Sequence, residues 1–271
     1  MQMSKELPIR SVSRALHVLQ AINSHGSLSM TQISNKVSLP YPTTCRIVNT
    51  LISEGVIERE TSRKYYRPTA LTQSLSCGYQ PRVRLVAIAR QHIEALTRKT
   101  GWPVSIASRV GSSMVIQDST HSMTTMTFSD YHPGYSLPIL SSASGMAYLA
   151  FTTEADREGI LKQLDEKPDT EEIHMFGKNP ELYFEMIRKE GYASFIRNPY
   201  TKDPGKTSSI AVPLFHNDVV IGALTLIFFS TTLRITDAFD KFKEDLFEAQ
   251  RHINADLVQT KLFKPEELSF N

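Results

Sequence analysis

The stretch from Ser29 to Glu54, SMTQISNKVSLPYPTTCRIVNTLISE, predicts two short helices joined by a tight turn. Ser29 can cap the first helix, because a serine oxygen accepts a hydrogen bond from a free amide of the first turn. Pro40 ends the first helix and Pro42 suits the start of the second, since proline disfavours helix before it but tolerates a helix start. The pattern is typical of a helix-turn-helix; an ordinary pair of helices with a solvated face is the alternative.

The second helix of this pair has an apolar face and a polar face. The apolar face is formed by Thr44, Ile47, Val48, Leu51 and Ile52, which recur at helical spacing. The polar face carries Arg46 and Asn49, whose side chains match guanine and adenine edges in the major groove. We expect both to contact DNA. The simpler interpretation is that Arg46 pairs with Glu54 or Glu58 and that Asn49 is only solvated.

A basic β-hairpin is predicted directly after the second helix. Gly55 ends the helix, and residues 56–60 and 64–67 form two strands around a turn at residues 61–63. Arg63 and Lys64 at the tip suit a phosphate or the minor groove, so the segment is predicted to be a winged helix-turn-helix. The residues expected to contact DNA are Thr31, Gln32, Tyr41, Thr43, Arg46, Asn49, Arg63 and Lys64.

Charge separates the first seventy residues from the rest. Residues 1–70 hold nine Lys and Arg against four Asp and Glu, net +5, whereas the remainder holds 21 against 24, net −3. A basic front part suits a nucleic-acid module, and the remainder suits another task. Cys45 and Cys77 indicate a reducing compartment and lack metal-ligand spacing. Because no apolar run is long enough to span a bilayer, we expect a cytoplasmic protein without membrane contact, metal or cofactor.

The whole pattern predicts an α+β fold in which an antiparallel sheet is flanked by helices. The opening helix should be capped by Ser11 or Ser13, and the last helix should return beside the helix at residues 82–100. Helices are expected near residues 13–24, 71–78, 82–100, 144–151, 153–164, 179–190 and 236–257. Further strands are expected near residues 104–108, 114–118, 123–128, 192–197, 208–215 and 219–229.

Taken together, the motifs of the chain resemble the IclR family of bacterial transcriptional regulators. In the first part they are Ser13-Arg14-Ala15-Leu16, Pro40…Thr43…Arg46, Leu51…Glu54-Gly55 and Tyr65-Tyr66-Arg67. In the second part they are Leu137-Pro138…Ser142-Ala143-Ser144-Gly145…Leu149-Ala150, Gly191-Tyr192 and Ser209-Ile210-Ala211-Val212-Pro213…Gly222. The resemblance implies a winged helix-turn-helix DNA-binding domain at residues 1–70 and a linker helix at 71–80. It also implies a GAF/PAS-like effector-binding and oligomerisation domain with a central antiparallel sheet at 81–271.

The resemblance also implies a function. Such proteins act as homodimers or dimers of dimers on double-stranded operator DNA, in response to a small molecule. The motifs of the second part are most similar to activators of aromatic-acid catabolism, hydroxyphenylpropionate operons among them. This implies a small aromatic carboxylate effector and, for an activator, contact with RNA polymerase. A repressor that responds to a non-aromatic acid is the alternative. Tyr41-Pro42 and Cys45 depart from the family pattern, so the operator sequence does not carry over.

An effector pocket is implied in the second domain. By resemblance, its walls are Met126, Phe128, Leu137, Ala143, Ser144, Phe195, Arg197, Ser209 and Leu224. An apolar slot suits a ring, amides at a helix N-terminus suit an anion, and the planar fork of Arg197 suits a carboxylate. The apolar wall residues could equally be ordinary core, and Arg197 could form a surface ion pair.

A sensor-domain enzyme is the alternative from another class, and three motifs argue against it. Gly205-Lys206-Thr207 lacks the glycine that a phosphate loop needs five residues earlier, where Tyr200 stands. Ser144 lacks the glycine that a nucleophile elbow needs two residues earlier. The eight histidines show no metal-ligand spacing such as H-E-x-x-H. We therefore expect no catalytic residues.

Overall fold

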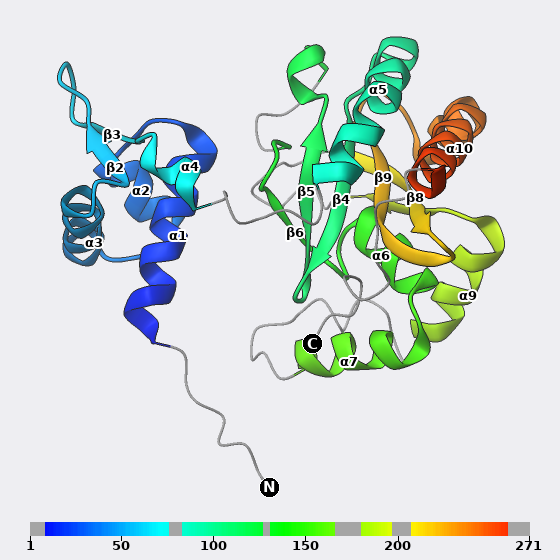
Figure 1. Cartoon of the computed structure of the whole chain (residues 1–271), viewed down its shortest axis with the longest axis horizontal. Helices are drawn as coiled ribbons and strands as arrows, with labels where there is room; N and C mark the ends of the chain where they lie inside the picture. The colour runs from blue at the N-terminus through cyan, green and yellow to red at the C-terminus, as the bar shows by residue number, and fades with distance from the viewer. Residues whose placement is uncertain (1–8, 76–82, 127–130, 166–179, 197–206, 260–271) are drawn as a thin grey trace, which may run out of the picture. The chain divides into compact units, whose positions relative to one another are not determined.

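The computed structural model of the 271-residue chain describes residues 9–75, 83–126, 131–165, 180–196 and 207–259. The chain divides into two compact units, residues 1–80 and 81–271, and each has its own hydrophobic core. Figure 1 shows the helices and strands of both units. Across these ranges, no helix combines the length and the apolar character that crossing a membrane requires.

The first unit consists of three helices and a small antiparallel sheet. The helices are α1 (Arg10–His25), α2 (Met30–Lys36) and α3 (Tyr41–Ser53), followed by the short α4 (Leu71–Ser74). The sheet has the order β1-β3-β2, with β1 (Leu28–Ser29), β2 (Ile57–Arg59) and β3 (Tyr65–Pro68). Its fully buried centre is formed by Val18, Ile22, Ile33, Val48 and Ile57. The predicted winged helix-turn-helix is thereby confirmed. Of the predicted helix at residues 71–78, residues 76–78 lie outside the described ranges.

Local hydrogen bonds fix the two helices of the motif. Ser29 caps α2 as predicted, because its Oγ accepts from the Gln32 amide at 3.4 Å while Gln32 Oε1 accepts from the Ser29 amide at 2.8 Å. Ser34 Oγ donates to the Leu39 carbonyl at 2.6 Å and holds the turn before α3. These bonds set the direction in which α3 leaves the turn.

The prediction that Ser11 or Ser13 caps the first helix is wrong. The α1 helix begins at Arg10, before both serines, and Ile9 is its cap residue without a side-chain hydrogen bond. The Ile9 carbonyl accepts from the amides of Val12 and Ser13, at 3.0 and 3.2 Å. Both serines therefore lie inside the helix.

The second unit is a six-stranded antiparallel sheet covered by helices on both faces. Its order is β6-β5-β4-β9-β8-β7, and every adjacent pair is antiparallel. The strands are β4 (Val104–Val110), β5 (Ser113–Ser119), β6 (Ser136–Pro138), β7 (Ala193–Ile196), β8 (Thr207–His216) and β9 (Val219–Phe229). The helices are α5 (Val83–Thr100), α6 (Ala143–Phe151), α7 (Glu154–Asp165), α9 (Pro180–Glu190) and α10 (Ile235–Gln259).

Alternate side chains of the central strands enter two separate cores. Helices α6, α7 and α9 cover one face of the sheet, and α5 and α10 cover the other (Figure 1). We name these the α6 face and the α5 face. The predicted pairing of the last helix with α5 is confirmed, because Lys99 Nζ lies 2.6 Å from Asp245 Oδ1 and His92 Nε2 lies 2.8 Å from Asp256 Oδ2.

The prediction of a strand at residues 123–128 is wrong for the described part. Residues His121–Met123 form one turn of 3-10 helix, and residues 124–126 have no strand pairing. Thr124 Oγ1 donates to the Gly101 carbonyl at 2.8 Å and accepts from the Met126 amide at 3.1 Å. A threonine hydroxyl that binds backbone groups in this way competes with the pairing of a strand. On the side away from β4, β5 pairs with β6, which the sequence did not predict.

Candidate functional site

The exposed face of α3 carries the side chains that were expected to read DNA bases. Thr44 and Val48 are fully buried, whereas Tyr41, Arg46 and Asn49 are exposed and Thr43 is half-buried, as the helical period requires. Within the described ranges, the Arg46 side chain has no ion-pair partner. An exposed arginine and an exposed amide one turn apart are therefore available to a partner.

Glu58, the other proposed partner of Arg46, is engaged elsewhere. It pairs with Arg67, its cross-strand neighbour, at 2.6 Å.

At the start of α3, the pKa of the Tyr41 phenol is raised, mainly by the nearby Cys45 and to a smaller extent by desolvation. Tyr41 therefore stays a neutral hydrogen-bond donor at pH 7.

The two α2 residues expected to contact DNA differ in their freedom. Thr31 is exposed in the first turn of α2. Gln32 is also exposed, but its Oε1 accepts from both the amide and the hydroxyl of Ser29, at 2.8 and 2.9 Å. Only the amide nitrogen of Gln32 is left for DNA, so its contact stays a prediction.

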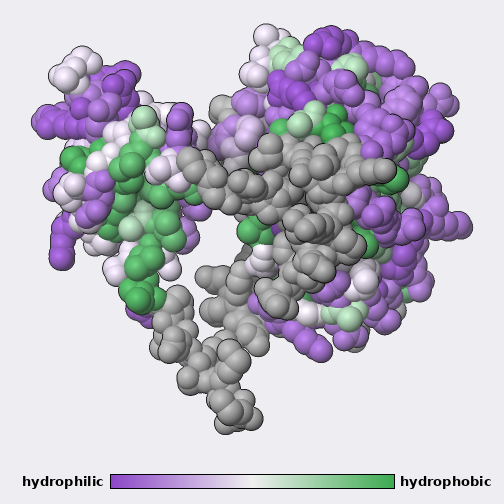
Figure 2. All heavy atoms as spheres, in the orientation of Figure 1, coloured by the Kyte–Doolittle hydropathy of each residue, from purple (hydrophilic) through white to green (hydrophobic). Residues whose placement is uncertain are grey.

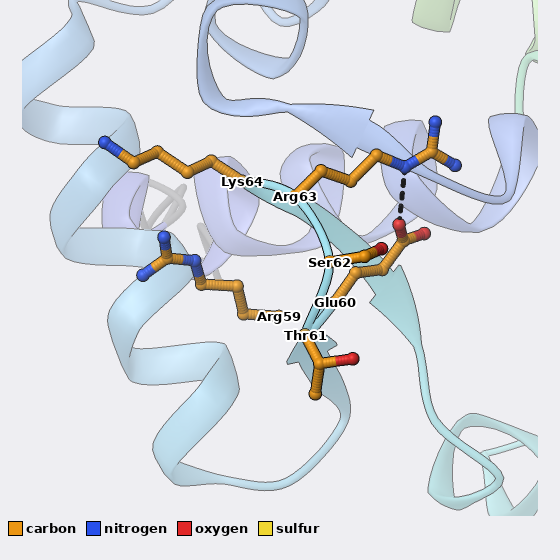
Figure 3. A pocket seen from close by; sticks show the side chains of 6 residues that line it. All are labelled: Arg59, Glu60, Thr61, Ser62, Arg63 and Lys64. Atoms are coloured by element: carbon orange, nitrogen blue, oxygen red, sulfur yellow. Dashed lines mark hydrogen bonds and ion pairs between the residues drawn. The ribbon is translucent and has the colours of Figure 1, made fainter.

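The β2–β3 hairpin, which we call the wing, gives its basic residues unequal neighbours. Figure 2 shows hydrophilic side chains gathered over it at the upper left. Arg63 Nε donates to Glu60 Oε2 at 2.7 Å, and its guanidinium lies 4.5 Å from the centre of the Tyr65 ring. Arg59 and Lys64 are exposed and extend to the other side of the wing, toward the α3 ribbon (Figure 3). Arg59 was missed from the sequence, because strand alternation alone does not tell which face of a short hairpin meets a partner.

Several of the residues expected to bind an effector share the α6 face. Leu137 and Ala143 belong to its buried core, and Phe195 packs against that core. Ser209 pairs with Phe195 across β8 and β7 and therefore lies on the same face. Ser144 is buried at the start of α6.

The start of α6 is held close to the sheet. Ser142 Oγ accepts from the Gly145 amide at 3.1 Å and donates to the Pro138 carbonyl at 2.7 Å. A Cβ on Gly145 would lie 1.9 Å from the Ile139 carbonyl oxygen, so only glycine allows this approach. The positive end of a helix dipole thus lies inside a buried part of the unit, where it favours an anion.

Leu224 and Met126 do not join this group, and their contact with an effector stays a prediction. Leu224 points to the α5 face, because it pairs with Val212 and both belong to that core. Leu224 lies in a strand whose other residues are nearly all apolar, so period-two alternation is hard to recognise from the sequence. Met126 is 39% exposed and follows the 3-10 turn. Phe128 and Arg197 lie outside the described residues.

Two hydroxyl residues on the α6 face were not predicted. Thr225 of β9 pairs with Ser105 of β4 and Ala211 of β8, and all three are buried. Within the described part of the chain, Thr225 Oγ1 is buried without a hydrogen-bond partner. Buried hydroxyls usually have a partner, so an exception indicates a place for a polar ligand atom. Its signal in the sequence is a threonine inside an otherwise apolar strand.

The comparisons with known proteins agree with this architecture. The model of the IclR helix-turn-helix domain matches residues 11–61, and the model of the bacterial transcriptional regulator IclR C-terminal part matches residues 77–255. The regulator KdgR of Dickeya chrysanthemi is 26% identical over 84% of this chain and 73% of its own length. The regulator BhcR of Paracoccus denitrificans is 27% identical over 93% of this chain and 89% of its own length.

Solved structures share the fold along nearly the whole chain. An IclR-family regulator from Brucella abortus has a TM-score of 0.63 at 23% identity, covering 93% of this chain and 94% of that one. An IclR homologue from Microbacterium hydrocarbonoxydans, solved in complex with 4-hydroxybenzoate, has a TM-score of 0.61 at 21% identity, covering 91% and 98%. These likenesses concern the fold, and the family matches concern the chain itself. The chain belongs to the IclR family of bacterial transcriptional regulators, and it carries the DNA-binding and C-terminal parts of that family in their usual order.

Proposed function

We propose that α3 reads operator bases through Arg46 and Asn49, assisted by Tyr41, Thr43, Thr31 and Gln32. The proposal depends on one observation, which is that Arg46 and Asn49 lie exposed one turn apart on α3 and that Arg46 has no ion-pair partner in the described ranges. Arginine can bind guanine through two hydrogen bonds and asparagine can bind adenine in the same way. Two or more copies of the chain would hold a pseudo-palindromic operator, since one winged unit reads only a few base pairs.

Substitution of Arg46 tests this reading. For Arg46→Ala we expect a loss of about 1–3 kcal/mol of discrimination between the promoter duplex and its mismatched versions. Fluorescence anisotropy with both duplexes measures the effect. Arg67→Ala is the matched control, because Arg67 is exposed but paired with Glu58. Unchanged sequence preference in Arg46→Ala would remove this residue from the recognition surface.

We further propose that the C-terminal unit responds to a small aromatic carboxylate bound on the α6 face. Three features support this: the buried Thr225 hydroxyl without a partner, the polar Ser209 and Ser144 beside apolar core, and the buried start of α6. The complex of the Microbacterium homologue with 4-hydroxybenzoate supports the aromatic class. Arg197 and Phe128 remain proposed partners of the carboxylate and the ring.

Calorimetry with hydroxylated phenylpropionates, benzoates and short keto acids tests the effector. For Thr225→Val we expect the unliganded protein to keep its stability, because the lost hydroxyl made no hydrogen bond. We expect weaker binding of the best acid by about 0.5–1.5 kcal/mol, the net value of one hydrogen bond. Thr231→Val, at an exposed position, is the control. Equal affinity in both variants would exclude Thr225 from the site.

The sign of regulation has two candidates. We propose an activator of an aromatic-acid operon that contacts RNA polymerase, in line with the motifs of the second part. A repressor that responds to a non-aromatic acid is the second candidate. Two relatives are named as repressors: the transcriptional repressor IclR of Escherichia coli and the acetate operon repressor of Salmonella typhimurium. Transcription from the adjacent promoter with purified polymerase, with and without the acid, decides between the two. Light scattering decides between dimer and dimer of dimers.

A further inference from the structure

The four basic side chains of the wing fall into two pairs with different neighbours. Arg67 Nη2 lies 2.6 Å from Glu58 Oε1, and Arg63 Nε lies 2.7 Å from Glu60 Oε2. In the described part of the molecule, Arg59 and Lys64 have no carboxylate partner. Two of the four cations are therefore paired with a carboxylate of the same chain, and two are not.

The two pairs also differ in direction. Figure 3 shows Arg59 and Lys64 extending from the hairpin on the side of the α3 ribbon, and Arg63 extending to the opposite side. Residues 59–64 line an open depression of about 400 Å³ at the wing tip. Arg59 and Lys64 therefore contribute uncompensated positive charge on the side of the wing on which the α3 ribbon lies (Figure 3).

Glu60 is the residue that keeps Arg63 on the opposite side. Its carboxylate accepts from Ser27 Oγ at 2.5 Å as well as from Arg63, and the Glu60 side chain is only 14% exposed. The Ser27 hydroxyl and then the Arg63 guanidinium lower the pKa of Glu60, so the carboxylate is ionised at pH 7. The Arg63 guanidinium also lies over the Tyr65 ring. Arg63 is thus held by a charge, a hydrogen bond and a ring at once.

We infer that Arg59 and Lys64 bind backbone phosphates beside the groove that α3 reads, and that Glu60 withholds Arg63 from the DNA. The inference rests on the proposed operator binding. It replaces the expectation that Arg63 contacts DNA, and it makes Arg63 and Glu60 positioning residues of the wing. Each phosphate that a cation neutralises releases counterions, so the number of contacts can be counted from the salt dependence of binding.

The experiment measures binding of the full chain to its own promoter duplex and to a random duplex between about 50 and 200 mM KCl. Log affinity falls as log salt rises. Each of Arg59→Ala and Lys64→Ala should make this fall less steep, reducing the magnitude of the slope by about 0.9 for both duplexes. Arg63→Ala and Arg67→Ala should leave the slope unchanged. Glu60→Gln should release Arg63 and increase the magnitude of this slope by about 0.9 on both duplexes, because a phosphate contact does not depend on sequence. The double variant Glu60→Gln with Arg63→Ala should return to the wild-type slope.

Each outcome decides a different point. A slope reduced by Arg63→Ala in the wild-type background, or unchanged by Arg59→Ala and Lys64→Ala, would overturn the inference. A wild-type protein with no preference for its promoter would instead overturn the proposed function itself. Circular dichroism at the assay temperature establishes that each variant is folded. Arg63→Ala is compared in the wild-type and Glu60→Gln backgrounds. A distorted wing would change the slope in both backgrounds, whereas the loss of a DNA-contacting charge would change it only in the second.

Discussion

At the residue scale, serines with similar sequence settings have different tasks because of their backbone neighbours. Ser29 precedes α2 and exchanges hydrogen bonds with Gln32 across the first turn. Ser11 precedes an apolar periodic segment in the same way, yet α1 begins before it and Ile9 supplies the accepting carbonyl. A sequence reveals candidate caps, but it does not reveal which residue within one or two positions is the last one outside the helix.

This difference predicts unequal effects of removing the two hydroxyls. Ser29→Ala should lower the free energy of unfolding of the first unit by about 1 kcal/mol, because it removes a helix cap. Ser11→Ala should change it by less than about 0.5 kcal/mol, since Ser11 is exposed and is not a cap. Urea denaturation followed by circular dichroism measures both. A loss in Ser11→Ala as large as in Ser29→Ala would contradict the assigned helix start.

At the scale of elements, α6 is fixed at both ends. At its C-terminal end, Arg157 donates to the carbonyls of Leu149 and Thr152, and Arg188 donates to that of Ala150, at 3.0–3.3 Å. The carboxylate of Glu181 accepts from both arginines. At its N-terminal end, Gly145 approaches the Ile139 carbonyl. A helix held at both ends can present its first amides in a constant position.

Glycine substitutions test this close approach. Gly145→Ala should lower the free energy of unfolding of the second unit by about 1–3 kcal/mol, the range for overpacking a core. Gly159→Ala is the control, because it lies in α7 with open space around a new Cβ and should add about 0.4–1 kcal/mol. Thermal denaturation measures the two variants in parallel. Equal stability of both variants would show that the start of α6 shifts easily.

Local signals predicted most elements, whereas the misses depend on contacts between parts of the chain that are distant in sequence. The caps, prolines and glycines around α2, α3 and the wing act on backbone within a few residues, so their effect can be predicted from the sequence. The segment at residues 123–126 has strand-like composition, but Thr124 binds the distant Gly101 carbonyl. The face of Leu224 could not be predicted, because both faces of β9 are apolar and covered. The Glu60–Ser27 bond joins residues 33 apart and was equally hidden.

At the scale of the whole molecule, two compact units that share no core cluster in the described residues imply two separate unfolding reactions. The first unit is centred on residues such as Ile33, and the second contains residues such as Ile106; both side chains are fully buried. Ile33→Ala should lower the stability of the first unit by about 2–5 kcal/mol and leave the other transition in place, and Ile106→Ala should do the reverse. Calorimetry resolves the transitions. A single transition that both variants shift equally would contradict independent units.

The alternation of β9 has one more consequence. Thr225 faces the α6 side, while its neighbours Leu224 and Leu226 are packed among the residues that contact α5 and α10. An acid held by the Thr225 hydroxyl would thus be separated by a single peptide group from the layer that contains α5, the first helix after residue 82. A shift of the β9 backbone on binding of an acid would therefore move side chains on both faces of the sheet at once, because the two faces share this backbone.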